Sequence, residues 1–157
     1  MTREIQLSQG MVSFVDDEDF EKVNSHKWFL CRSNQTYYAI RHARINGKVK
    51  TFSIHREVLK APKGLQVDHI NHNGLDNRKE NLRLATNTEN ARNKKSTGHK
   101  GVCWNKSAKM YQAKITINYK SIHLGCFESV SDAAKAYDKA AKNYFGDFAQ
   151  LNFPEKM

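Results

Sequence analysis

The stretch VDHINHNGLDNRKENLRLATNTENARN, residues 67–93 of a 157-residue chain, contains the most informative pattern in the sequence. An apolar start is followed by a polar, turn-rich stretch at 71–81 and by a short apolar run at 82–84. Thr86 and Glu89 then form a Thr-x-x-Glu capping box, which is typical of a helix start. The predicted order is therefore strand, long loop, strand and helix.

Four polar residues in this stretch are candidates for phosphodiester chemistry. Asp68 and His69 close the first strand, Asn81 lies twelve residues after His69, and Asn90 lies on the predicted helix. Hydrolysis needs a base and a cation, and His69 can take a proton at neutral pH because an unperturbed histidine pKa is about 6.5. Asp68 and the amide oxygen of Asn90 suit Mg²⁺ or Mn²⁺ and do not suit zinc.

The pattern resembles the His-Asn-Asn variant of the HNH endonucleases, which are ββα-metal (His-Me finger) nucleases, and in particular the small homing endonucleases of phages and introns. The resemblance implies that His69 is the catalytic base and that Asn81 fixes its ring. It also implies one divalent cation, Mg²⁺ or Mn²⁺, at Asp68 and Asn90. The β-rich region before the motif, including His55-Arg56, fits the family more loosely.

Other interpretations of the same residues stay open. His72 is a rival base, although the Asn- and Gly-rich run around it predicts a mobile loop. Adjacent strand residues point to opposite faces, so Asp68 and His69 can serve one site only if the backbone bends or bulges there. An Asp-His pair at a strand end can also be a surface pair, and the run 71–77 can be a plain loop.

The N-terminal third predicts a small β-rich platform. Residues 5–15 indicate two short strands around Gly10, and the acidic run 16–19 suits a helix start. Asn46-Gly47, between two strand-like runs, is the best local hairpin signal in the chain.

A basic run without apolar residues, RNKKSTGHK at 92–100, indicates a linker. Beyond it, the alternation over 111–117 predicts a half-buried strand, and a second strand follows through Cys126. Ser129 opens an amphipathic helix that Gly146 ends. This region is predicted to form a three-stranded antiparallel sheet packed on one helix.

The same region resembles the DNA-binding domain of the plant APETALA and ethylene-response-factor proteins. Gly101-Val102, YQAKI at 111–115, LGCF at 124–127, the helix alanines and LNF at 151–153 carry the resemblance. It implies that the sheet enters the major groove while the helix packs behind it.

The residues expected to contact DNA lie on the outward sheet face and in the linker. Where the family usually places base-reading arginines, this chain has Cys103 and Thr116, which leaves mostly phosphate contacts. The sheet lysines can alternatively form a solvated face. The expected contacts are Arg92, Lys94, Lys95, Lys100, Trp104, Asn105, Lys106, Gln112, Lys114, Thr116, Lys120 and His123.

Charge agrees with a polyanionic partner. Lys and Arg number 26 against 16 Asp and Glu, a formal net charge of +10, and the excess is spread along the chain. No run is apolar enough for a membrane span and no secretion signal is evident, so a cytoplasmic setting is expected. The three cysteines include no C-x-x-C pair and are interpreted as buried or semi-buried thiols.

The sequence thus predicts an α+β chain with a nuclease domain at 1–95, a basic linker at 96–100 and a DNA-binding domain at 101–154. We expect a monomeric, metal-dependent, site-specific endonuclease that nicks double-stranded DNA and needs no protein partner. A catalytically inactive DNA-binding regulator and a nuclease acting on branched DNA or RNA are the alternatives.

Overall fold

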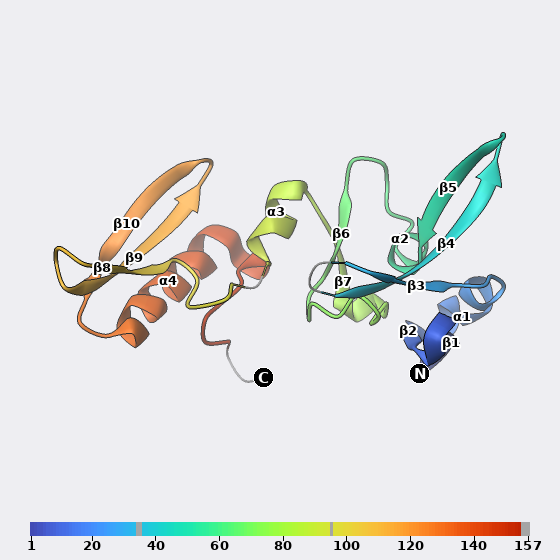
Figure 1. Ribbon diagram of the computed structural model, residues 1–157, viewed down its shortest axis with the longest axis horizontal. Helices are drawn as coiled ribbons and strands as arrows, with labels where there is room; N and C mark the ends of the chain where they lie inside the picture. The colour runs from blue at the N-terminus through green and yellow to red at the C-terminus, as the bar shows by residue number, and fades with distance from the viewer. Residues whose placement is uncertain (34–35, 95, 155–157) are drawn as a thin grey trace. The chain divides into compact units, whose positions relative to one another are not determined.

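The computed structural model describes residues 1–33, 36–94 and 96–154, so the prediction for Lys95 lies outside the described residues. The chain divides into two compact units, Met1–Asn87 and Thr88–Met157. Helices and several small antiparallel sheets alternate along it, as an α+β chain requires (Figure 1). No helix among the described residues is long and apolar enough to cross a lipid bilayer.

The first unit contains three small antiparallel sheets, β1-β2, β3-β4-β5 and β6-β7. The predicted β-rich platform and the hairpin at Asn46-Gly47 are confirmed, whereas helix α2 was not predicted. The elements are β1 Thr2–Gln6, η1 Ser8–Gly10, β2 Val12–Asp16, α1 Asp17–Asn24, β3 Phe29–Arg32, β4 Tyr37–Ile45, β5 Lys48–Ser53, α2 Ile54–Val58, β6 Gln66–His69, η2 Lys79–Asn81 and β7 Leu82–Ala85.

Apolar side chains from most of these elements form one core in the first unit. Ile5, Val15, Val23 and Ile54 are almost fully buried in it. Trp28 packs beside them and donates its indole N–H to the carbonyl oxygen of Val23 over 2.8 Å. This core supports β6, where the candidate base lies, because Leu75 within the polar loop and Leu82 directly after it are also part of the core.

The second unit places a three-stranded sheet, in the order β10-β9-β8, against one helix. The predicted alternation is confirmed, since Ala113 and Ile115 are buried whereas Lys114 and Thr116 are exposed. Tyr137 of the helix packs on Ile115 in the core. The elements are β8 Val102–Asn105, β9 Met110–Ile117, β10 Lys120–Phe127, α4 Val130–Phe145 and η3 Gly146–Phe148, and α3 Asn87–Arg92 lies at the boundary between the units.

The ends of α4 follow the sequence prediction. The hydroxyl oxygen of Ser129 accepts hydrogen bonds from the backbone N–H groups of Ser131 and Asp132, which caps the helix. Gly146 ends it with a φ of 52°, a left-handed conformation that glycine adopts without strain. Both signals are local, which is why the sequence alone located them.

Candidate active site

His69 is the last residue of β6, and its side chain is buried. β6 pairs with β7 in a ladder that sets Asp68 opposite Arg83 and His69 opposite Leu82, with no register shift between these described strands. The backbone therefore neither bends nor bulges at Asp68-His69, although the charge of Asp68 still acts on the imidazole of His69. Because neighbouring strand residues point to opposite faces, Asp68 contacts Arg83 while His69 turns toward Asn77.

A chain of buried hydrogen bonds holds the ring of His69. Its Nε2 lies 3.2 Å from Oδ1 of Asn77, and Nδ2 of Asn77 donates to Oγ of Ser13 over 2.7 Å. The Ser13 hydroxyl donates in turn to the carbonyl oxygen of Leu75 over 2.9 Å. Ser13 and Asn77 are both fully buried. Ser13 of strand β2 thus supports the imidazole indirectly, by holding the Asn77 side chain that contacts it.

The donors and acceptors in this series of hydrogen bonds determine which ring nitrogen of His69 carries the proton. The single hydroxyl hydrogen of Ser13 goes to Leu75, so the Asn77 atom beside Ser13 must be the donating amide nitrogen. The amide oxygen therefore faces His69 and accepts from Nε2–H. Only one nitrogen of a neutral imidazole is protonated, so Nδ1 is the basic atom.

Two aromatic rings surround the imidazole of His69. The ring of His55 meets it edge-on with centroids 5.2 Å apart, and the ring of Tyr38 lies 5.7 Å away. Burial lowers the pKa of His69 below 6.5, against the opposing effects of the Asn77 contact and of nearby Asp carboxylates. His69 is therefore neutral at pH 7 and can accept a proton.

The surrounding rings are themselves uncharged at neutral pH. Burial, together with the charges of His69 and Arg56, lowers the pKa of His55 to about 3. Burial and the charge of Asp68 raise the pKa of Tyr38, so its hydroxyl keeps its proton. The imidazole of His69 thus lies in a poorly solvated aromatic environment.

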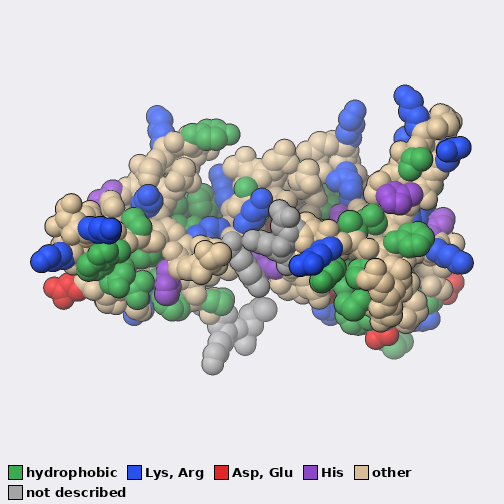
Figure 2. Space-filling view, viewed as in Figure 1, with side chains coloured by type: hydrophobic (Ala, Val, Ile, Leu, Met, Phe, Trp, Pro, Cys, Tyr) green, Lys and Arg blue, Asp and Glu red, His purple; other side chains and the backbone are tan. Residues whose placement is uncertain are grey.

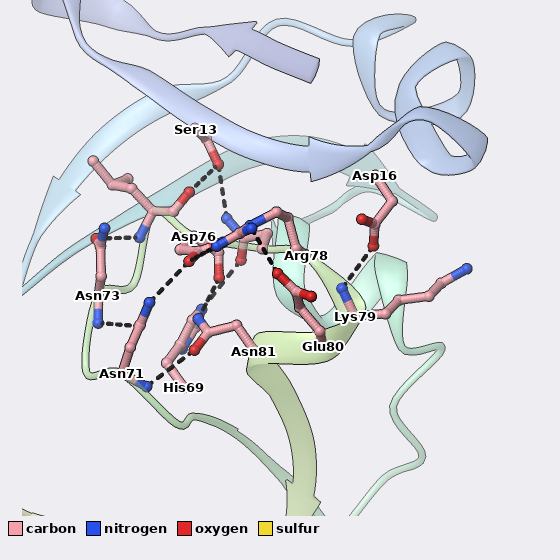
Figure 3. Close-up of polar contacts among 12 residues, drawn as sticks. Ser13, Asp16, His69, Asn71, Asn73, Asp76, Arg78, Lys79, Glu80 and Asn81 are labelled. Carbon is pink, nitrogen blue, oxygen red and sulfur yellow. Dashed lines mark hydrogen bonds and ion pairs between the residues drawn. The ribbon is translucent and has the colours of Figure 1, made fainter. Parts of the chain in front are cut away.

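Asn81 is predicted to fix the ring of His69, and its side-chain amide bonds to the loop between β6 and η2. Its Oδ1 accepts the backbone N–H of Asn71 over 3.0 Å, and its Nδ2 donates to the carbonyl oxygen of Asp76 over 2.8 Å (Figure 3). The contact to the imidazole comes from Asn77 instead. Asn81 therefore positions the loop that carries Asn77, the residue whose amide contacts the imidazole of His69.

The loop around His72 differs from the mobile loop that the sequence suggested. Arg78 donates from Nε and Nη2 to the two carboxylate oxygens of Asp76, each over 2.8 Å, and Asn71 donates to the same carboxylate (Figure 3). His72 has a φ of 64° and its backbone N–H bonds to the carbonyl oxygen of His69 over 3.0 Å. His72 is half-buried in the turn that follows β6.

Asp68 is the carboxylate of the predicted cation site, and it is already paired. Its Oδ2 accepts from Nε and Nη2 of Arg83 over 2.8 and 2.7 Å. Across the described ranges, no group of three or more His, Cys, Asp or Glu side chains could hold a metal ion. One carboxylate oxygen and one amide oxygen fit only a cation such as Mg²⁺, which binds few protein oxygens and keeps waters or substrate phosphates.

Asn90, the second predicted cation ligand, lies on α3 within the second unit and is half-buried. Its role beside Asp68 stays a prediction, as does the predicted division of the chain at residues 96–100.

The predicted DNA contacts of the second unit fall into two groups. The side chains of the first group are exposed: Lys94, Trp104, Lys106, Lys114, Thr116 and Lys120. The others make hydrogen bonds within the unit or are partly covered. Gln112 donates to Nδ1 of His123, and Asn105 accepts two backbone N–H groups of the β8–β9 turn. Arg92 lies over the ring of Phe145, and Lys100 donates to the carbonyl oxygens of Arg92 and Lys94.

Sequence reasoning missed Ser13, Tyr38 and Asn77, and it gave His55 no role. Asn77 lies inside the Asn-rich loop, but no local pattern separates it from its neighbours. Ser13 is 64 residues away from Asn77 and carries no motif, so only the fold brings the two together.

Comparisons with known proteins agree with a hydrolytic site of this kind. Residues 60–92 match the HNH endonuclease family. The chain is 30% identical over 145 residues to an uncharacterized HNH endonuclease of Acanthamoeba polyphaga mimivirus. This alignment covers 92% of the chain and 76% of the viral protein. The chain is also 32% identical over 95 residues to protein 3.8 of Escherichia phage T7, covering 57% of this chain and 78% of that protein.

The chain therefore belongs to the HNH endonuclease family, and it is a nuclease with a nucleic acid substrate. Nucleases of this family generally use divalent metal ions. A shorter match, 47% identical over 38 residues, is to dehydration-responsive element-binding protein 2E of Arabidopsis thaliana and covers 24% of this chain and 16% of that protein. This match is short, so the DNA-binding role of the second unit stays a prediction.

Proposed function

We propose that the chain is a divalent-cation-dependent endonuclease that hydrolyses one phosphodiester of double-stranded DNA with His69 as general base. The observation that carries the proposal is the buried, neutral imidazole whose Nε2 is engaged by Asn77. It lies within the segment that matches the HNH endonucleases.

His69 acts through Nδ1, which takes a proton from the attacking water as the new oxygen–phosphorus bond forms. The bond from phosphorus to the leaving sugar oxygen breaks, and that oxygen takes a proton from water. Burial keeps the ring neutral before the reaction, so the lone pair is available. The charges of Asp68 and Asp76 favour the protonated ring once it has formed. Asn77 keeps the ring fixed during the transfer, because its oxygen accepts Nε2–H in both protonation states.

Asn90 is a ligand by the family resemblance only, and the carboxylate of Asp68 would offer an oxygen to the cation. When bound, it neutralises charge on the phosphate and on the leaving oxygen. Arg83 fixes the orientation of the Asp68 carboxylate from the opposite strand.

The second unit is proposed to hold the duplex through the exposed face of its sheet. Lys114 and Thr116 lie on that face. Trp104, which is 49% exposed, and Lys120 pair with Tyr111 and Ile117, which occupy the alternate positions. Contacts from this face suit phosphates and position the substrate without reading much sequence. One HNH segment per chain gives one active site, so a monomer should nick one strand.

Cleavage of supercoiled plasmid by the full chain tests this proposal. With Mg²⁺ or Mn²⁺ we expect open circles well before linear DNA, and no product with a chelator. His69→Ala should lower the rate by at least about 10²-fold, the typical contribution of general acid–base catalysis, while duplex affinity is kept.

His72→Ala is the matched control and should retain most activity. If His72→Ala is inactive while His69→Ala cuts normally, the base has been misassigned. Duplex binding without cleavage by the wild type would favour the regulator, and faster cleavage of branched DNA or RNA would favour the other nuclease class.

A further inference from the structure

Charge is segregated within the first unit. Residues 22–56 contain eight Lys or Arg and no Asp or Glu, whereas residues 16–21 contain five carboxylates. Strands β4 and β5 lie in the middle of the basic segment, and Lys and Arg side chains project at the hairpin end of this unit (Figure 2). The hairpin is therefore a basic surface outside the candidate active site.

The hairpin is anchored at its base and extends into solvent at its tip (Figure 1). At the base, Arg41 pairs with Glu57 over 2.7 Å and its guanidinium lies over the ring of Phe52. At the tip, Asn46 and Gly47 have φ values of 51° and 75°, the left-handed conformations of a tight hairpin turn. The anchored base holds the exposed tip at a defined angle to its unit.

The cations at the tip lie on both faces of this ribbon. Arg44 is paired with Val49, while Ile45 is paired with Lys48 and Ala43 with Lys50. Since directly paired residues share a face and successive residues alternate, Arg44 lies on one face and both lysines on the other.

Arg44, Lys48 and Lys50 are exposed, and no ion pair forms at any of them within the described chain. A flat anionic surface such as a membrane would use the cations of one face only. A groove bounded by two phosphate strands uses both.

We propose that the β4–β5 hairpin is a DNA-binding arm whose tip enters the major groove of the duplex substrate, with Arg44 facing one phosphate strand and Lys48 and Lys50 the other. The inference deepens the proposed function and rests on its duplex substrate. A major groove about 12 Å wide admits a two-stranded ribbon whose strands lie about 4.8 Å apart. Val49, 65% exposed at the tip, offers an apolar contact to thymine methyl groups.

Binding of a fluorescein-labelled duplex to the full chain, measured by anisotropy between about 50 and 200 mM salt without divalent cations, tests the arm. Each lost phosphate contact should lower the log–log salt slope by about 0.9, which is about an eightfold loss of affinity at 0.1 M salt. Arg44→Gln should therefore cost about eightfold, and Lys48→Gln with Lys50→Gln about 60-fold.

Exposed residues of the same unit supply matched controls. Arg32→Gln is the control for Arg44→Gln, and Lys60→Gln with Lys63→Gln is the control for the double variant. The controls should keep the wild-type slope. If substitutions on only one face of the hairpin lower the duplex affinity, the arm does not lie between two phosphate strands and the proposal is overturned. It is overturned equally if the control variants lose as much affinity as the hairpin variants.

A duplex whose cytosines carry glucosylated hydroxymethyl groups, which fill the major groove, tests the choice of groove. The loss caused by the hairpin substitutions should vanish on this duplex, because the arm can no longer enter. A loss that persists there would overturn major-groove insertion. Absence of duplex binding by the wild type would overturn both proposals, whereas wild-type binding with unchanged slopes in every hairpin variant would overturn only this one.

Discussion

Acid should destabilise the first unit through His55. Its ring packs against Tyr38 and His69, and it lies 3.0 Å from the hydroxyl of Ser53. Burial is the main reason that its pKa falls to about 3, with the charges of His69 and Arg56 adding to the effect. His55→Phe keeps an aromatic ring in this space and removes the titration.

The sign and size of this change in folding stability follow from proton linkage. Below pH 6.5 the unfolded chain protonates residue 55, while the folded chain does not until about pH 3. The stability present above pH 6.5 is therefore lost as the pH falls through this window. Between pH 7 and pH 5 the loss attributable to His55 is about 2 kcal/mol, of the same order as the margin that keeps small domains folded.

Fluorescence of Trp28, which is 2% exposed in the first core, reports the unfolding. In a Trp104→Phe background Trp28 is the only tryptophan, so urea titrations at pH 7 and pH 5 follow this unit. The background protein should lose about 2 kcal/mol more than its His55→Phe derivative. His26→Phe, at an exposed histidine, should behave like the background. Equal losses with and without His55 would refute the argument.

Two further substitutions test the base and the second unit. Asn77→Ala should slow cleavage by up to about 10²-fold without weakening duplex binding, because the ring is no longer fixed. Nitrogen NMR should then show the His69 proton leaving Nε2, whereas Asn73→Ala, which loses only a loop hydrogen bond, should leave it there. Gly101→Ala should destabilise the second unit by about 2–5 kcal/mol in thermal melts followed by circular dichroism, because φ is +74° and a Cβ would lie 2.0 Å from Tyr137. Gly98→Ala, where a Cβ meets nothing within 4 Å, is the control and should melt normally.

The elements that could be predicted are those with local causes. The order of β6, the polar loop, β7 and α3 follows from turn residues between short apolar runs. The hairpin at Asn46-Gly47 follows from a dipeptide that adopts positive φ readily. Helix α4 follows from its cap and its 3.6-residue period. Each of these signals lies within the segment that it shapes.

The support of the base could not be predicted, because it depends on pairing between distant segments. The polar stretch at 71–81 contains four asparagines, and contacts with β2 determine which of them reaches His69. Phe14 exchanges backbone hydrogen bonds with Leu75 and Asn77, and this pairing places Ser13 beside the Asn77 amide. A family pattern indicates Asn81 as important, but it does not distinguish holding the loop from holding the ring.

The pairing of Asp68 with Arg83 has a consequence for how the site assembles. A cation at Asp68 must share the carboxylate with a guanidinium that lies 2.7 Å from Oδ2. Repulsion between the two positive charges weakens binding by this carboxylate alone. Phosphate oxygens of the substrate supply further negative ligands of the kind that Mg²⁺ prefers. Within the proposed function, cation and nucleic acid would therefore bind more tightly together than separately.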